Sequence, residues 1–112
     1  STWAAYNAAG LTYDSTLTFA GRAGFRCGTC YEYPVYDLAA DAPLALRERP
    51  LVVMEVTLLE YMGYSPDRAG EEILRLAGRC RRFGGDFTLL WHNDRLIEPR
   101  EKALYRSVVE AL

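Results

Sequence analysis

Residues 51–92 read LVVMEVTLLEYMGYSPDRAGEEILRLAGRCRRFGGDFTLLWH, and their pattern predicts a strand, a helix and a second strand. Leu51–Val56 and Phe87–Trp91 are apolar without alternation, except for Glu55, which is typical of strands that are covered on both faces. Between them, Ser65-Pro66-Asp67 supplies a capping serine, a proline at the first helical position and an acid in the first turn. We therefore expect a helix over Ser65–Phe83 that crosses from one strand to a parallel neighbour.

The remainder of the chain adds shorter elements to this unit. Pro34 makes Tyr31–Tyr36 an edge strand or an extended loop, and the glycines of Ala20–Thr29 indicate a loop. The other expected elements are a helix over Thr2–Ala9, a strand over Leu11–Asp14 in the same parallel sheet, and a last helix from Pro99. The predicted fold class is α/β, a parallel sheet flanked by helices, with residues 1–112 as a single domain.

Composition narrows the classes of protein and the compartment. The 112 residues are 50% hydrophobic and 25% charged, as in an ordinary globular domain. Thirteen Lys and Arg against 15 Asp and Glu leave a net charge of −2, which argues against a nucleic-acid partner. No apolar run approaches the roughly 18 residues of a membrane span. Three cysteines do not suit a secreted disulfide framework, so we expect a reducing, cytoplasmic compartment.

Polar residues at the ends of the two apolar strands are the first candidates for chemistry. His92, the one histidine, directly follows Trp91, and an imidazole there could give or take a proton near neutral pH, although a loop or capping role is the alternative. Glu55 interrupts an otherwise apolar strand, so it either finds a partner such as His92 or points to solvent. We expect the first arrangement, with both side chains at the carboxyl ends of neighbouring strands.

The glycine-rich loop offers weaker candidates. Arg26 could hold a carboxylate of a ligand or form a surface ion pair. Cys27-Gly28-Thr29-Cys30 has the spacing of a redox dithiol, but the Tyr31-Glu32-Tyr33-Pro34 that follows is a poor helix and gives no pKa-lowering dipole. The tyrosines of this region could stack on sugar rings or pack in the structure.

Four segments in order carry a family resemblance: GLTYDSTL at 10–17, GFRCGTC at 24–30, PLVVMEVTL at 50–58 and LLWHN at 89–93. Together they resemble the C-terminal half of polysaccharide-deacetylase-like proteins, the carbohydrate esterase family 4 or NodB-homology group, in a bacterial branch found near surface-polysaccharide genes. The resemblance implies half of a distorted (β/α) barrel that removes acetyl groups from amino sugars with a divalent, zinc-like metal. It also implies that Leu90-Trp91-His92 matches the Leu-x-His motif that supplies the general acid.

The resemblance extends to further residues and also has gaps. It makes Glu55 the carboxylate that orients His92, where the family has Asp, and it places Asp14, Arg26 and Trp91 near a carbohydrate substrate. The family's Asp-Asp pair and His-x-x-x-His metal ligands have no counterpart in this chain, so no cofactor is expected in the chain itself. We therefore expect a fragment or subdomain that is inactive alone, whose partner is the other half of the domain or a second copy. The alternatives are a non-catalytic module that binds carbohydrate or protein, and a thiol redox protein.

Overall fold

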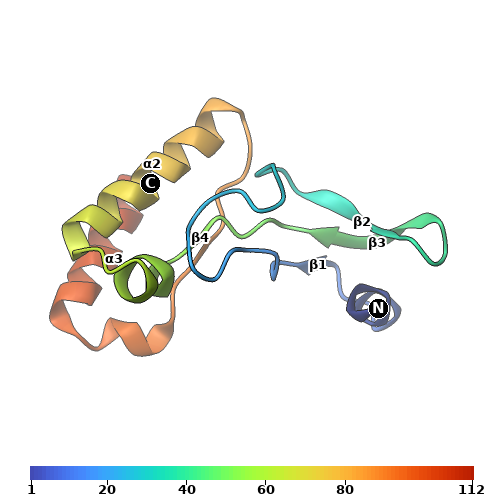
Figure 1. Ribbon diagram of the computed structural model, residues 1–112, viewed down its shortest axis with the longest axis horizontal. Helices are drawn as coiled ribbons and strands as arrows, with labels where there is room; N and C mark the ends of the chain where they lie inside the picture. The colour runs from blue at the N-terminus through green and yellow to red at the C-terminus, as the bar shows by residue number, and fades with distance from the viewer.

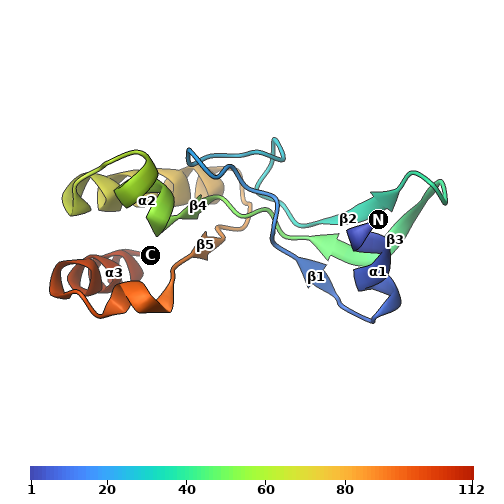
Figure 2. The same cartoon turned by 60° about the horizontal axis from the view of Figure 1, so that its bottom comes forward.

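The computed structural model describes residues 1–112 and shows a mixed α/β fold with two small sheets. Two lobes follow one another along the longest dimension of the molecule, which measures 47 × 30 × 23 Å (Figure 1). The N-terminal lobe holds the first helix and a three-stranded sheet, and the C-terminal lobe holds the other helices around a two-stranded sheet (Figure 2). The expected α/β class is confirmed at this level.

The N-terminal lobe is built on a hairpin. Helix α1 (Thr2–Ala8) begins at Ser1, whose hydroxyl accepts the backbone N–H of Ala4, as expected for a capping serine. Strand β2 (Tyr33–Asp37) pairs antiparallel with β3 (Ala42–Glu48), and β1 (Tyr13–Asp14) joins β3 on the other side as a parallel neighbour. Pro34 lies in β2, an edge strand, where its lack of an N–H is tolerated.

The expectation of one parallel sheet is wrong. β1 pairs with β3, through Tyr13 opposite Arg47 and Asp14 opposite Glu48. These strands belong to the three-stranded sheet, which is separate from the β4–β5 sheet. The physical reason is the β3 segment, which was not expected to be a strand. Its residues alternate between exposed and buried positions along Ala42–Glu48, with Leu46 buried, so it forms a half-buried strand and takes β1 as its neighbour.

The C-terminal lobe contains the predicted strand–helix–strand unit. β4 (Val53–Met54) is followed by a short π-helix η1 (Thr57–Tyr61), helix α2 (Pro66–Arg82) and strand β5 (Leu89–Leu90), and β4 pairs parallel with β5. The parallel crossover is therefore confirmed. A 3₁₀ turn η2 (Asn93–Leu96) and helix α3 (Pro99–Ala111) complete the lobe. Both paired strands are shorter than expected. β4 ends at Met54, because the chain turns into a helical conformation at Glu55, and β5 pairs with it only over Leu89–Leu90.

One apolar core lies between α2, α3 and the β4–β5 sheet. Ile73 and Leu76 on one face of α2 pack with Leu58, Leu104 and other buried side chains. The radius of gyration is 15.7 Å, against about 13 Å for a compact chain of this length. The elongated shape leaves 20 of the 112 residues buried, so much of each lobe faces outward. None of the helices has both the length and the apolar character needed to cross a bilayer.

Candidate active site

Parallel pairing of β4 and β5 brings Glu55 and His92 together. Met54 lies opposite Leu90 in the register, Glu55 directly follows the end of β4, and His92 follows two residues after Leu90. Both residues therefore lie beyond the carboxyl ends of adjacent strands, the edge at which α/β folds gather polar side chains. The expected placement of His92 and Glu55 is present in the structure.

A single carboxylate oxygen of Glu55 holds His92 in two ways. Glu55 Oε1 lies 2.6 Å from His92 Nδ1 and accepts the backbone N–H of His92 at 2.9 Å. The Glu55 side chain is fully buried, whereas the His92 side chain is 45% exposed. The second oxygen, Oε2, is buried without a hydrogen-bond partner in the protein. Two bonds from one residue fix both the position of the histidine and the plane of its ring.

This geometry determines which ring nitrogen can act on a ligand. With Nδ1 facing a carboxylate, the proton on Nδ1 donates to Glu55, and Nε2 is the nitrogen left without a partner in the protein. The pair can therefore deliver or accept a proton at Nε2, the requirement for a general acid or base.

Trp91 lies beside His92 in sequence but packs inside the lobe. Its ring meets the edge of the Tyr105 ring from α3, with centroids 5.2 Å apart and an interplanar angle of 75°. The indole Nε1 is buried and has no hydrogen-bond partner in the protein. Trp91 thus anchors the end of β5 against α3, directly next to the histidine.

Asp14 belongs to a different cluster, in the N-terminal lobe. Its Oδ2 accepts the Thr16 hydroxyl at 2.6 Å and the indole N–H of Trp3 at 3.2 Å. Its neighbour across the β1–β3 pairing is Glu48, which is fully buried and accepts the backbone N–H of Leu17. No hydrogen bond or ion pair joins this cluster to His92 or Glu55.

The pKa values of the two carboxyls in this cluster are shifted in opposite directions. Burial raises the pKa of Glu48 to about 7, and the hydrogen bond to Asp14 adds to this effect. For Asp14, burial acts to raise the pKa, but hydrogen bonds from Thr16, Glu48 and Trp3 outweigh it, and the pKa lies below its usual value. Of the two carboxyls, Glu48 is therefore the one that holds a proton as the pH falls below about 7, beside an ionised Asp14.

Arg26 and the cysteines have local roles in the described contacts. Arg26 is exposed and donates from Nη1 to the carbonyl of Thr18 at 2.8 Å, which closes the glycine-rich loop. Burial raises the pKa of the Cys80 thiol to about 12, and a hydrogen bond with Cys30 acts in the same direction. A thiol held in this way is a poor nucleophile.

The resemblance implies a divalent metal, which needs about three protein ligands held together at one point. No three His, Cys, Asp or Glu side chains are grouped so that they could hold a metal ion. His92 Nδ1 and Glu55 Oε1 are hydrogen-bonded to each other. The residues of this chain therefore do not fit a metal site on their own.

Glu48 is the residue that sequence reasoning missed. It lies in a charged segment, Arg47-Glu48-Arg49-Pro50, which has no apolar run to indicate a strand. The alternation of Leu44, Leu46 and Glu48 is the signal that could have found it, because it places Glu48 on the buried face of a strand.

Comparisons with known proteins leave the class of protein to be argued from this geometry. No family model, no curated protein and no solved structure matches the chain. What the fold and site define is a mixed α/β protein with a carboxylate-oriented histidine at the carboxyl ends of two parallel strands.

Proposed function

We propose that this chain is the part of an amino-sugar N-deacetylase-like domain that carries the general acid, His92. The observation that supports the proposal is the pair formed by His92 Nδ1 and the buried Glu55 carboxylate, 2.6 Å apart. In hydrolysis of an N-acetyl group, the departing amine needs a proton as the carbon–nitrogen bond breaks. His92 supplies that proton from Nε2, and Glu55 holds the ring and stabilises its charged form.

The remaining parts of the proposal follow from the resemblance. The chain corresponds to the C-terminal half of a distorted (β/α) barrel, and the parallel β4–β5 pair joined through α2 fits one repeat of such a barrel. Activation of the attacking water belongs to the other half of the domain, so residues 1–112 alone should be inactive. In this proposal Asp14, Arg26 and Trp91 belong to the surroundings of the site and not to the proton transfer.

The sequence that the gene encodes ahead of Ser1 tests the proposal. An Asp-Asp pair and a His-x-x-x-His motif there would support an esterase domain, and their absence would contradict it. The direct assay measures acetate released from an N-acetylglucosamine oligomer by the complete gene product and by residues 1–112. We expect release by the complete product and none by the shorter chain.

A second candidate is a non-catalytic module that binds carbohydrate or protein. It is favoured by the exposure of Tyr31 and Tyr36, which are 48% and 49% exposed. Titration with neutral oligosaccharides distinguishes the two candidates. Binding that Tyr36→Ala weakens and His92→Ala leaves unchanged would favour the module over the esterase.

A further inference from the structure

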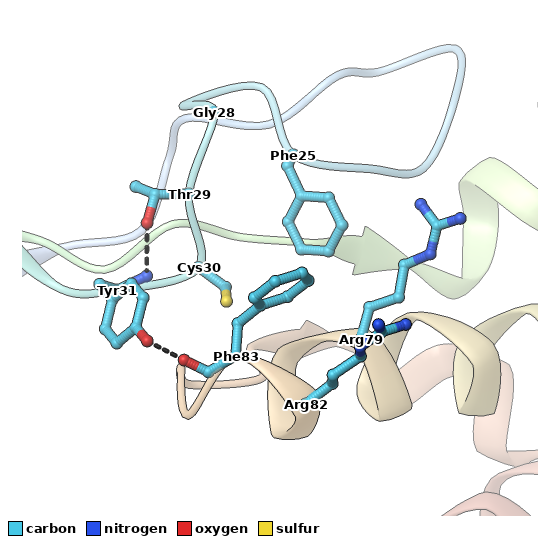
Figure 3. Close-up of a pocket in the computed structure, with 8 residues that line it drawn as sticks. All are labelled: Phe25, Gly28, Thr29, Cys30, Tyr31, Arg79, Arg82 and Phe83. Atoms are coloured by element: carbon cyan, nitrogen blue, oxygen red, sulfur yellow. Dashed lines mark hydrogen bonds between the residues drawn. The ribbon is translucent and has the colours of Figure 1, made fainter.

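A pocket of about 620 Å³ opens between the glycine-rich loop and the C-terminal end of α2. It is lined by Phe25, Gly28, Thr29, Cys30 and Tyr31 from the loop and by Arg79, Arg82 and Phe83 from the helix end (Figure 3). Its volume lies within the range of small-molecule sites. None of these residues takes part in the His92–Glu55 pair.

The pocket lies at the other end of the strands from His92. The backbone of Gly24, near its rim, donates to the carbonyl of Val52, and Val52 donates to Thr88. Val52 and Thr88 precede β4 and β5, whereas Glu55 and His92 follow them. The pocket is therefore separate from the site of the proposed deacetylase function.

Two phenyl rings form the apolar part of the pocket. Phe25 reaches in from the loop and Phe83 from the end of α2, and Figure 3 shows the two rings near each other across the pocket. Phe83 is 65% exposed, so its ring is open to a ligand in the pocket. Tyr31 fixes this end of the helix, because its hydroxyl donates to the Phe83 carbonyl. A flat, partly apolar ring is the group that such a pair of faces accepts.

Two guanidinium groups form the charged part. Arg79 and Arg82 extend along the side of the phenyl rings that lies away from Tyr31 (Figure 3). Neither forms an ion pair. The Arg82 guanidinium lies over the Phe83 ring, 5.8 Å from its centroid, so the charged and apolar parts of the pocket adjoin each other. An unpaired guanidinium offers several N–H donors in a plane, and carboxylates are the groups that match them.

We propose that this pocket binds a ring-shaped carboxylate. The ring packs against Phe25 and Phe83, and the carboxylate accepts hydrogen bonds from Arg79 and Arg82. The ring could be that of a sugar acid or of an aromatic acid, since both present an apolar ring face and a carboxylate bonded directly to the ring.

Calorimetric titration of residues 1–112 tests the proposal with four probes. Glucuronate and benzoate each carry a ring and a carboxylate, glucose has the ring alone, and acetate has the carboxylate alone. We expect saturable binding of glucuronate, benzoate or both, and at least tenfold weaker binding of glucose and acetate. The tighter of the two ring acids identifies the source of the ring.

Matched variants link any binding to the pocket. Arg79→Gln and Arg82→Gln should each weaken binding of the ring acid about tenfold, the loss expected for one charged hydrogen-bonded partner. Arg106→Gln, an exposed and unpaired arginine of α3, should leave binding unchanged. The proposal is overturned if no ring acid saturates the protein, if glucose binds as tightly as glucuronate, or if both pocket variants bind like the wild type.

Discussion

Glu55 Oε1 accepts both the backbone N–H and the Nδ1–H of His92, at 2.9 and 2.6 Å, so one buried oxygen fixes the whole residue. The backbone bond locates the residue at the end of β5, and the side-chain bond sets the ring. A histidine held in this way presents the same nitrogen to any bound molecule. The relation depends on β4 and β5 being parallel neighbours, because only then do their carboxyl ends coincide.

The tautomer of His92 provides the first prediction. In the wild type, neutral His92 should carry its proton on Nδ1, because that nitrogen faces the Glu55 carboxylate. Nitrogen-15 chemical shifts of the imidazole ring measure this directly. Glu55→Gln should raise the population of the Nε2–H form, since an amide can turn its NH₂ toward Nδ1. An equal tautomer mixture in the wild type would contradict the hydrogen bond.

Glu48 predicts a pH dependence of stability. Its pKa in the folded protein, about 7, lies above its value of 4.5 in the unfolded chain. Folding therefore favours the protonated form of Glu48. The stability that this adds is present in full below about pH 4.5 and is lost as the pH rises through about 7. The loss is of the order of 3 kcal/mol in the free energy of unfolding.

The matched test of this contribution is Glu48→Gln, which keeps a neutral hydrogen-bond donor beside Asp14. Thermal unfolding of the wild type should shift down by several degrees between pH 5 and pH 8. The variant should lose most of that shift and be the more stable protein at pH 8. Equal pH dependence in both proteins would show that Glu48 is ionised in the fold.

Gly85 predicts a steric effect in the C-terminal lobe. A Cβ built on Gly85 would lie 2.2 Å from Cys30 Sγ and 3.4 Å from its Cβ, and Cys30 is buried. Gly85→Ala should therefore destabilise the protein by about 1–3 kcal/mol. Gly78→Ala is the control, since nothing lies within 4 Å there and alanine favours a helix by roughly 0.5–1 kcal/mol. Urea unfolding of both variants measures the difference.

The elongated shape predicts self-association of residues 1–112. The two-stranded β4–β5 sheet leaves strand edges open, and Leu90 on β5 is 41% exposed. Light scattering at high concentration should detect a dimer or larger assembly, and Leu90→Glu should reduce it. Leu38→Glu, in the β2–β3 turn, should have no effect, since Leu38 is 87% exposed and lies at the tip of the hairpin. A monodisperse wild-type monomer would contradict the half-barrel interpretation.

The long, strongly patterned segments could be predicted from the sequence. The Ser65 cap, Pro66 and the apolar face through Ile73 and Leu76 determined α2. The positions of Glu55 and His92 at adjacent strand ends could be predicted in the same way, because two apolar runs joined by one helix favour a parallel pair of strands. Predicting this pair of residues required no information about the rest of the chain.

The N-terminal sheet could not be predicted in the same way. The β1–β3 pairing covers two residues, Tyr13 and Asp14, and their partners lie more than thirty positions away on a strand identified by a weak alternation. The carboxyl pair of Asp14 and Glu48 depends on that pairing, so it could not be expected once β3 was missed. The pocket between Phe25 and Phe83 likewise depends on how an irregular loop meets a helix end.

The central claim is that His92 donates a proton during hydrolysis of an N-acetyl group and that Glu55 positions it. The most direct measurement is the rate of acetate release from an N-acetylglucosamine oligomer by the complete gene product, compared with its His92→Ala and Glu55→Gln variants across pH. We predict that His92→Ala lowers kcat by about 10²–10⁴ and that Glu55→Gln lowers it less and changes the pH profile, with KM little affected in both. Acetate release by His92→Ala at the wild-type rate would contradict the account.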